Sequence, residues 1–137
     1  MPFNLELQHT LQAAANRIIP PDEFPDAWTA GVGNYLQRQW QSDLSASVPV
    51  YEAGLNALNA EAHRQCGAAF ASLTTAQQDD VLRCVEAGEV QTHWSVPPRH
   101  FFQMLVKHIS EGYYGDMMSS EPISWQMLGY TERCRRA

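Results

Sequence analysis

Apolar residues return at every third or fourth position in one segment of this chain after another, and this spacing limits the fold more than any other feature. No long run alternates Val, Ile or Thr with polar residues, as a half-buried strand would. A spacing of three to four residues places apolar side chains on one face of a helix, which must then be buried against other helices. The pattern predicts an all-α fold, a single-domain bundle of about five main helices spanning residues 1–137.

Prolines and glycines delimit the first two predicted helices. The first should end at Pro20 and Pro21, because proline lacks the amide hydrogen and disfavours helical backbone before it. The second is expected over residues 27–40, weakened by Gly31 and Gly33, a pair that suggests the close approach of another backbone. The apolar stripes of the two helices are Leu7, Leu11, Ala14, Ala15 and Ile18, and Val32, Leu36 and Trp40.

Three further helices follow, each with a recognisable start or stop. The third is expected from Pro49 to a left-handed stop at Gly67. Thr74 and Gln77 form a capping box that begins the fourth, which should stop at Gly88. The fifth opens at Pro97-Pro98 and is the most apolar, so it should be central. On the third helix, Tyr51, Leu55, Leu58 and Ala62 form the buried stripe, and Glu52, Asn59 and Arg64 are expected to face solvent.

Beyond Gly112 the sequence becomes irregular and rich in aromatic residues. A stretch without a helical stripe has few ways to hide large apolar side chains, and soluble monomers seldom expose a contiguous apolar patch. We therefore expect this segment to bind a partner, with Trp125 and Tyr130 as the strongest candidates. The alternative is that these two residues close the domain's own core. The predicted partner-binding residues are Tyr113, Tyr114, Met117, Met118, Trp125 and Tyr130.

The net charge of the chain argues against nucleic acid as a partner. Fifteen acidic residues against nine basic ones give a net charge of −6, so the chain should repel phosphate backbones and nucleic acid is not an expected partner. Arg133, Arg135 and Arg136 are interpreted as a solvated terminus.

No apolar run approaches the roughly 18 residues of a membrane span, and the first residues do not resemble a signal peptide. The sequence as written predicts a cytoplasmic protein, or a periplasmic one if a signal was removed or the complex is co-exported.

No pattern of catalytic, cofactor-binding or metal-ligating residues stands out. The three cysteines lack CxxC spacing, and the pair His63 and Cys66 supplies only two ligands. His100 and His108 lie about 80° apart around the predicted fifth helix, too far to chelate one ion easily. Neither a GxSxG elbow nor a glycine-rich phosphate loop occurs. We expect no catalytic residue, bound cofactor or metal in this chain.

Three stretches together resemble the gluconate 2-dehydrogenase subunit 3 family. Residues 14–22 read AANRIIPPD and are followed by Pro25, Ala30-Gly31-Val32 and Tyr35-Leu36. The second stretch has Tyr51, Gly54, Leu55 and Leu58, then Phe70, Leu73, Gln77, Gln78, Val81 and Leu82. The third begins at Phe101-Phe102 and continues through Glu111-Gly112-Tyr113-Tyr114, Asp116, Trp125 and Leu128-Gly129-Tyr130. The loop at residues 117–122 departs from the family pattern.

The resemblance implies a helical small subunit without a redox centre of its own. Such subunits bind a large FAD-containing subunit of the glucose-methanol-choline type, which oxidises a sugar, sugar acid or polyol, and a cytochrome c subunit is a possible further partner. The expected function is therefore to bind and stabilise that flavoprotein, or to help it mature or be exported. Two alternatives are a transient assembly or export chaperone, which would leave the folded flavoprotein, and a small stand-alone enzyme.

Overall fold

The structure is a computed structural model and describes residues 2–20 and 26–118. Helices account for every regular element in these two ranges, so the predicted all-α fold is confirmed. The five α-helices of the described residues are α1 (Leu5–Ile18), α2 (Val32–Trp40), α3 (Val48–Cys66), α4 (Thr75–Ala87) and α5 (Pro98–Met118). Two short 3-10 helices, η1 (Ser45–Ser47) and η2 (Phe70–Ser72), join α2 to α3 and α3 to α4.

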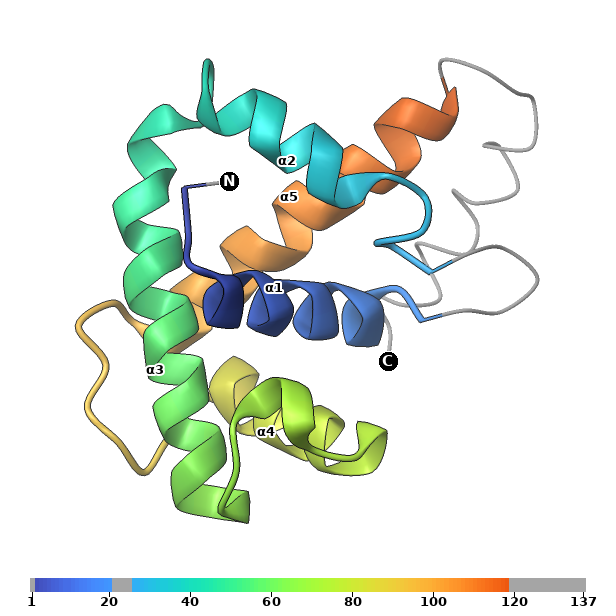
Figure 1. Ribbon diagram of the computed structural model, residues 1–137. Coiled ribbons are helices and arrows are strands. Elements are labelled where there is room, and N and C mark those ends of the chain that lie inside the picture. Colours follow the sequence, from blue (N-terminus) through green and yellow to red (C-terminus); the bar gives the residue numbers. More distant parts are fainter. Residues whose placement is uncertain (1, 21–25, 119–137) are drawn as a thin grey trace.

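Helix α5 is the central element of the bundle, as its composition predicts. It crosses behind α1 in Figure 1 and contacts α1, α2, α3 and α4. Its residues Phe101, Leu105 and Ile109 are almost fully buried, and each follows the previous one by one helical turn. Among the described residues, no helix is long and apolar enough to cross a membrane.

The predicted starts of α3, α4 and α5 and the predicted stops of α3 and α4 agree with the structure within about one residue. Gly67 ends α3 with φ of 81° and Gly88 ends α4 with φ of 76°, a left-handed backbone that only glycine adopts without strain. The capping box of α4 is complete: the Gln77 amide donates to the Thr74 hydroxyl, and the Thr74 amide donates to the Gln77 side chain.

Helix α2 starts five residues later than predicted, and the reason is Gly31. This glycine has φ of 101° at the N-cap of α2, so residues 27–31 form turns instead of helix. The prediction that a backbone approaches the glycine pair is wrong at Gly33. A β-carbon there would lie 2.7 Å from the indole ring of Trp28, so it is a side chain that occupies the space.

Two further predictions are corrected. Asn59 does not face solvent on α3: it is 7% exposed and accepts a hydrogen bond from the Phe70 amide at 3.1 Å. The sequence beyond Gly112 is not irregular at once, because α5 continues to Met118. Gly112 lets α2 pack closely on this part of α5, since a β-carbon there would lie 2.6 Å from the ring of Tyr35.

Candidate functional site

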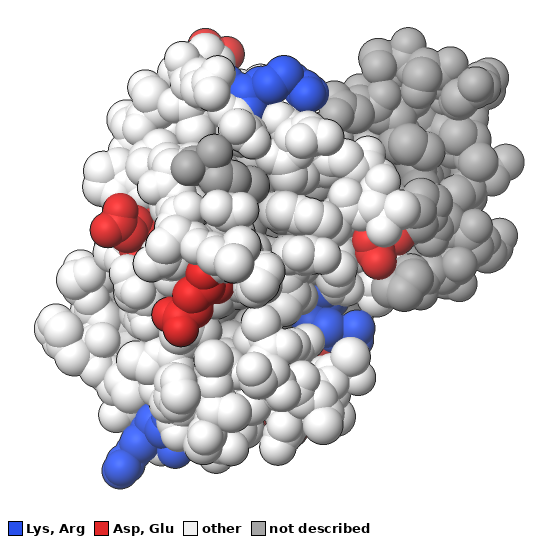
Figure 2. Space-filling view, viewed as in Figure 1, with Lys and Arg blue, Asp and Glu red and all other residues white. Residues whose placement is uncertain are grey.

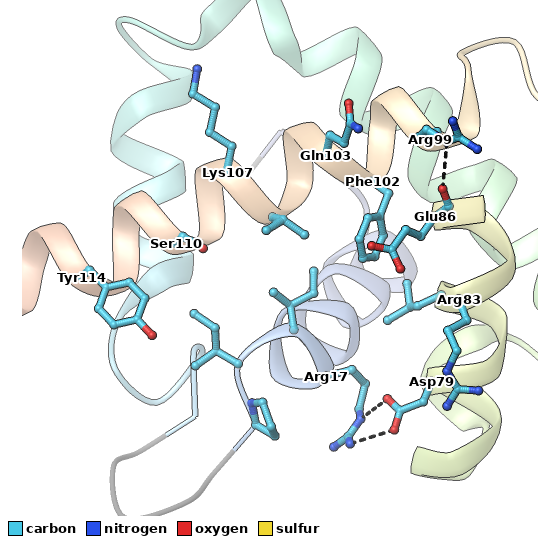
Figure 3. A pocket seen from close by; sticks show the side chains of 15 residues that line it. Arg17, Asp79, Arg83, Glu86, Arg99, Phe102, Gln103, Lys107, Ser110 and Tyr114 are labelled. Carbon is cyan, nitrogen blue, oxygen red and sulfur yellow. Dashed lines mark hydrogen bonds and ion pairs between the residues drawn. The ribbon is translucent and has the colours of Figure 1, made fainter. Parts of the chain in front are cut away.

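A groove of about 820 Å³ lies where the C-terminal end of α1 meets α4 and α5 (Figure 3). We call it the α1–α4–α5 groove. Phe102 points from α5 toward α1 in the middle of the groove, and Tyr114 lies at one end. The apolar described residues that line it are Ile18, Ile19, Pro20, Leu82, Phe102, Val106 and Tyr114.

Helical spacing places the lining residues on two facing helix surfaces. On α4, Asp79, Leu82, Arg83 and Glu86 follow one another at intervals of three, one and three residues, and therefore share one face. On α5 the same rule aligns residues 99, 102, 103, 106, 107, 110 and 114. The third wall is the last turn of α1 with the residues up to Pro20, where proline stops the helix.

Charged side chains form the rim of the groove. Arg17 donates two hydrogen bonds to the Asp79 carboxylate, from Nε at 2.9 Å and from a terminal nitrogen at 3.2 Å. Arg99 donates to the backbone carbonyls of Glu86 at 3.2 Å and Ala87 at 2.9 Å, which are free acceptors at the C-terminal end of α4. These contacts join α1 to α4 and α4 to α5, and they hold the three walls in place.

Two other cations on the rim, Arg83 and Lys107, are more exposed and make no bond to another helix among the described residues. Arg83 pairs with Asp80 on its own helix at 2.6 Å, but both side chains are about two-thirds exposed. Lys107 is exposed and makes no hydrogen bond or ion pair with the described residues. It extends from the edge of α5 away from α1 and α4 in Figure 3.

A buried carboxylate on α3 holds the loop that precedes α5. Glu61 is 0% exposed and accepts hydrogen bonds from the amides of Gln91 and Thr92, the Thr92 hydroxyl at 2.6 Å and the Trp94 indole at 3.4 Å. Burial raises the pKa of Glu61, but these bonds and one from Gln65 outweigh it, so its pKa lies below the ordinary value. Sequence reasoning missed this residue. The available signal was its place beside Leu58 and Ala62 on the apolar stripe of α3.

A tyrosine and a histidine also meet in the core. The Tyr51 hydroxyl lies 2.8 Å from Nδ1 of His108, and the two rings stack with centroids 5.7 Å apart. Burial lowers the pKa of His108 and raises that of Tyr51, because both charged forms lose hydration. The pair joins α3 to α5 inside the core, and His100 is exposed, so the structure does not bring the two α5 histidines together.

The positions of the histidine, cysteine and carboxylate side chains show whether the described residues contain a metal site. In the two described ranges, no three of these side chains come close enough to hold a metal ion. Within the same ranges Cys66 and Cys84 are free thiols and both are half-buried. That the whole chain binds no metal or cofactor stays a prediction.

The predicted partner-binding residues fall into three groups. Tyr113 and Tyr114 are helical, 2% and 6% exposed, and pack edge to face with ring centroids 5.0 Å apart, so the argument from missing burial does not hold for them. Met117 and Met118 are in the last turn of α5. Trp125 and Tyr130 lie outside the described residues.

The family model described as gluconate 2-dehydrogenase subunit 3 matches residues 6–131, which is nearly the whole chain. No curated protein and no solved structure matches the chain significantly. All three stretches that carry the resemblance contribute to the groove: Arg17 to Pro20 come from the first, Leu82 from the second, and Phe102 and Tyr114 from the third.

Proposed function

This chain belongs to the gluconate 2-dehydrogenase subunit 3 family, and we propose that it is the non-catalytic small subunit of a flavin-dependent dehydrogenase. Its partner is a large subunit of the glucose-methanol-choline type, which holds FAD and oxidises a sugar, sugar acid or polyol. The small subunit binds this flavoprotein and stabilises it, or helps it to mature.

The observation that carries the proposal is the family match over residues 6–131. The family description names a subunit, and a subunit functions within an assembly. The resemblance further implies that the flavin and the reacting groups belong to the large subunit.

The polar side chains inside the described core support this division of labour. The Glu61 carboxylate is engaged by a loop, and His108 is engaged by Tyr51. Each of these groups therefore has a structural role that accounts for its burial. General acid or base catalysis would instead need the group within reach of a substrate.

For the docking surface we retain part of the sequence-based prediction. Met117 and Met118 end α5, and Trp125 and Tyr130 follow within twelve residues of Met118. Aromatic and methionine side chains are enriched in the centres of protein interfaces. In the proposed complex these four residues contact the large subunit, while Tyr113 and Tyr114 belong to the core of this chain.

Co-expression with a FAD-containing large subunit of the glucose-methanol-choline type from the same organism tests the proposal. We expect a stable complex of one copy of each chain on size-exclusion chromatography, with flavin absorbance in the complex and none in the isolated small subunit. Flavin at unit occupancy in the isolated chain would contradict the proposed division of labour. A flavoprotein that matures only in the presence of this chain, and is then released, would identify the chain as a transient chaperone.

A further inference from the structure

We propose that the α1–α4–α5 groove receives an acidic segment of the flavoprotein partner, in which an apolar side chain is flanked by carboxylates. This inference rests on the proposed function and adds the surface and the chemistry of recognition. The occupant is thus a partner protein, neither a small anion nor a second copy of this chain.

The apolar floor of the groove accounts for the apolar side chain. Ile18 from α1, Leu82 from α4 and Phe102 from α5 come from three helices and line one hollow. Phe102 and Val106 are half-buried, whereas Phe101 and Leu105 beside them are almost fully buried in the core. An apolar side chain entering the groove would remove the exposed parts of these residues from water, which stabilises association.

The charge on the rim accounts for the carboxylates. Of the described residues that line the groove, Arg17, Arg83, Arg99 and Lys107 are cationic, and only Asp79 and Glu86 are acidic. The lining thus carries two more cations than carboxylates, or one more when Asp80, the partner of Arg83, is counted, on a chain whose net charge is −6. Charged side chains are few and scattered on the face shown in Figure 2. Complementary charge of this kind steers a partner and sets its orientation.

The contacts of the rim also make the groove rigid before binding. The Arg17 side chain is 20% exposed and fixed by two bonds to Asp79, and Arg99 is fixed on the end of α4. Lys107 and Arg83 are exposed, and no bond to another helix uses them among the described residues. Arg17 and Arg99 therefore shape the site, while Lys107 and Arg83 are the cations most available to the partner's carboxylates.

Charge reversal on the rim tests the electrostatic part. Lys107→Glu and Arg83→Glu are introduced into the full chain together, and the affinity for the co-expressed flavoprotein is measured at low and high salt. We expect at least a tenfold loss of affinity at low salt, and a weaker salt dependence than that of the unmodified chain. Arg64→Glu is the matched control, since Arg64 is exposed at the end of α3 and outside the groove. It should change the affinity by less than about twofold.

Val106→Asp tests the apolar part, with Leu5→Asp as its control because Leu5 is 64% exposed on α1. We expect the first to lower the affinity at least tenfold and the second to leave it unchanged. Melting temperatures of the isolated variants are measured alongside. A lower melting temperature with unchanged affinity would mean that a part of this chain fills the groove. A stable homodimer that the groove variants dissociate would mean that a second copy of the chain occupies it. Either result overturns the inference.

The two proposals fail in different ways. If the unmodified chain forms no complex with the flavoprotein, the proposed function is wrong. If the complex forms and the groove variants bind as tightly as the two controls, the function stands and the groove is not the docking site.

Discussion

The Tyr51 hydroxyl and Nδ1 of His108 lie 2.8 Å apart in the core, and this hydrogen bond joins the start of α3 to the middle of α5. In the neutral tautomer that carries its proton on Nε2, Nδ1 of His108 accepts a hydrogen bond from the Tyr51 hydroxyl. A protonated ring cannot accept this bond, and its charge would be buried. Trp40 also contacts the Tyr51 ring edge to face at 5.1 Å, so the pair belongs to the aromatic part of the core.

The first prediction is a loss of stability in mild acid. Burial and Lys107 lower the pKa of His108 while Glu111 raises it, and the net pKa lies below the unfolded value of about 6.5. The unfolded chain then binds more protons at His108 than the folded chain. The contribution of His108 to stability is therefore complete above about pH 6.5 and declines as the pH falls toward the folded pKa.

Urea denaturation between pH 5 and pH 8 measures this effect. His108→Gln should flatten the dependence of the unfolding free energy on pH. His100→Gln is the control, because His100 is exposed on the same helix and its replacement should leave the dependence intact. If the unfolding free energy of the two variants depends equally on pH, a group other than His108 causes the loss of stability in acid.

The second prediction concerns the buried carboxylate of α3. Glu61→Gln removes one of the two oxygens that accept the amides of Gln91 and Thr92 and the Thr92 hydroxyl. We expect a loss of at least about 2 kcal/mol in the unfolding free energy, because charged buried acceptors contribute most and their donors would be left unsatisfied. Glu52→Gln, on the exposed side of α3, should cost less than about 0.5 kcal/mol. Hydrogen exchange should also quicken at residues 91 and 92; unchanged exchange would mean that Glu61 does not hold the loop.

The third prediction concerns the crossing of α3 and α5. A β-carbon at Gly54 would collide with the ring of Phe101, which is 1% exposed and has little room to move. Gly54→Ala should therefore destabilise the chain by about 1–3 kcal/mol through overpacking. Alanine normally favours a helix by about 1 kcal/mol over glycine, so a stabilising result would show that the ring yields. The double variant Gly54→Ala with Phe101→Leu should recover part of the loss, as thermal denaturation can show.

Local signals in the sequence predict most of the fold. Proline and glycine act through their own backbone, so the ends of α3 and α4 follow directly from Gly67 and Gly88. Gly31 shows the limit of such reasoning, since a single glycine at φ of 101° starts α2 and the sequence does not specify that conformation. Asn59 and Glu61 show another limit, because their burial depends on donors in η2 and in the loop before α5.

The groove could not be predicted in the same way. Its lining residues come from the end of α1, from α4 and from α5, and only the packing of these helices brings them together. The sequence points instead to the aromatic residues after Gly112. For Tyr113 the helical continuation of α5 changes the interpretation, because a tyrosine on the buried side of a helix needs no partner to cover it.

The fourth prediction separates a core aromatic residue from a docking residue. Tyr113 is 2% exposed, so Tyr113→Ala should lower the unfolding free energy by about 3–5 kcal/mol, whether or not the flavoprotein is present. Trp125→Ala should leave the melting temperature of the isolated subunit nearly unchanged and weaken the complex roughly thirtyfold, which corresponds to about 2 kcal/mol at an interface centre. The two variants are compared by melting temperature and by recovery of the complex.

The comparison is informative because the two substitutions remove similar aromatic surface at positions with different expected surroundings. If Trp125→Ala lowers the melting temperature as much as Tyr113→Ala does, Trp125 belongs to the core of this chain. This is the alternative prediction from the sequence, in which Trp125 and Tyr130 close the domain's own core. If Trp125→Ala alters neither quantity, the residues after α5 do not dock, and the variants of the α1–α4–α5 groove decide where the flavoprotein binds. A loss of complex at unchanged melting temperature would place Trp125 in the interface, since a residue that stabilises only the bound state leaves the free subunit as it was.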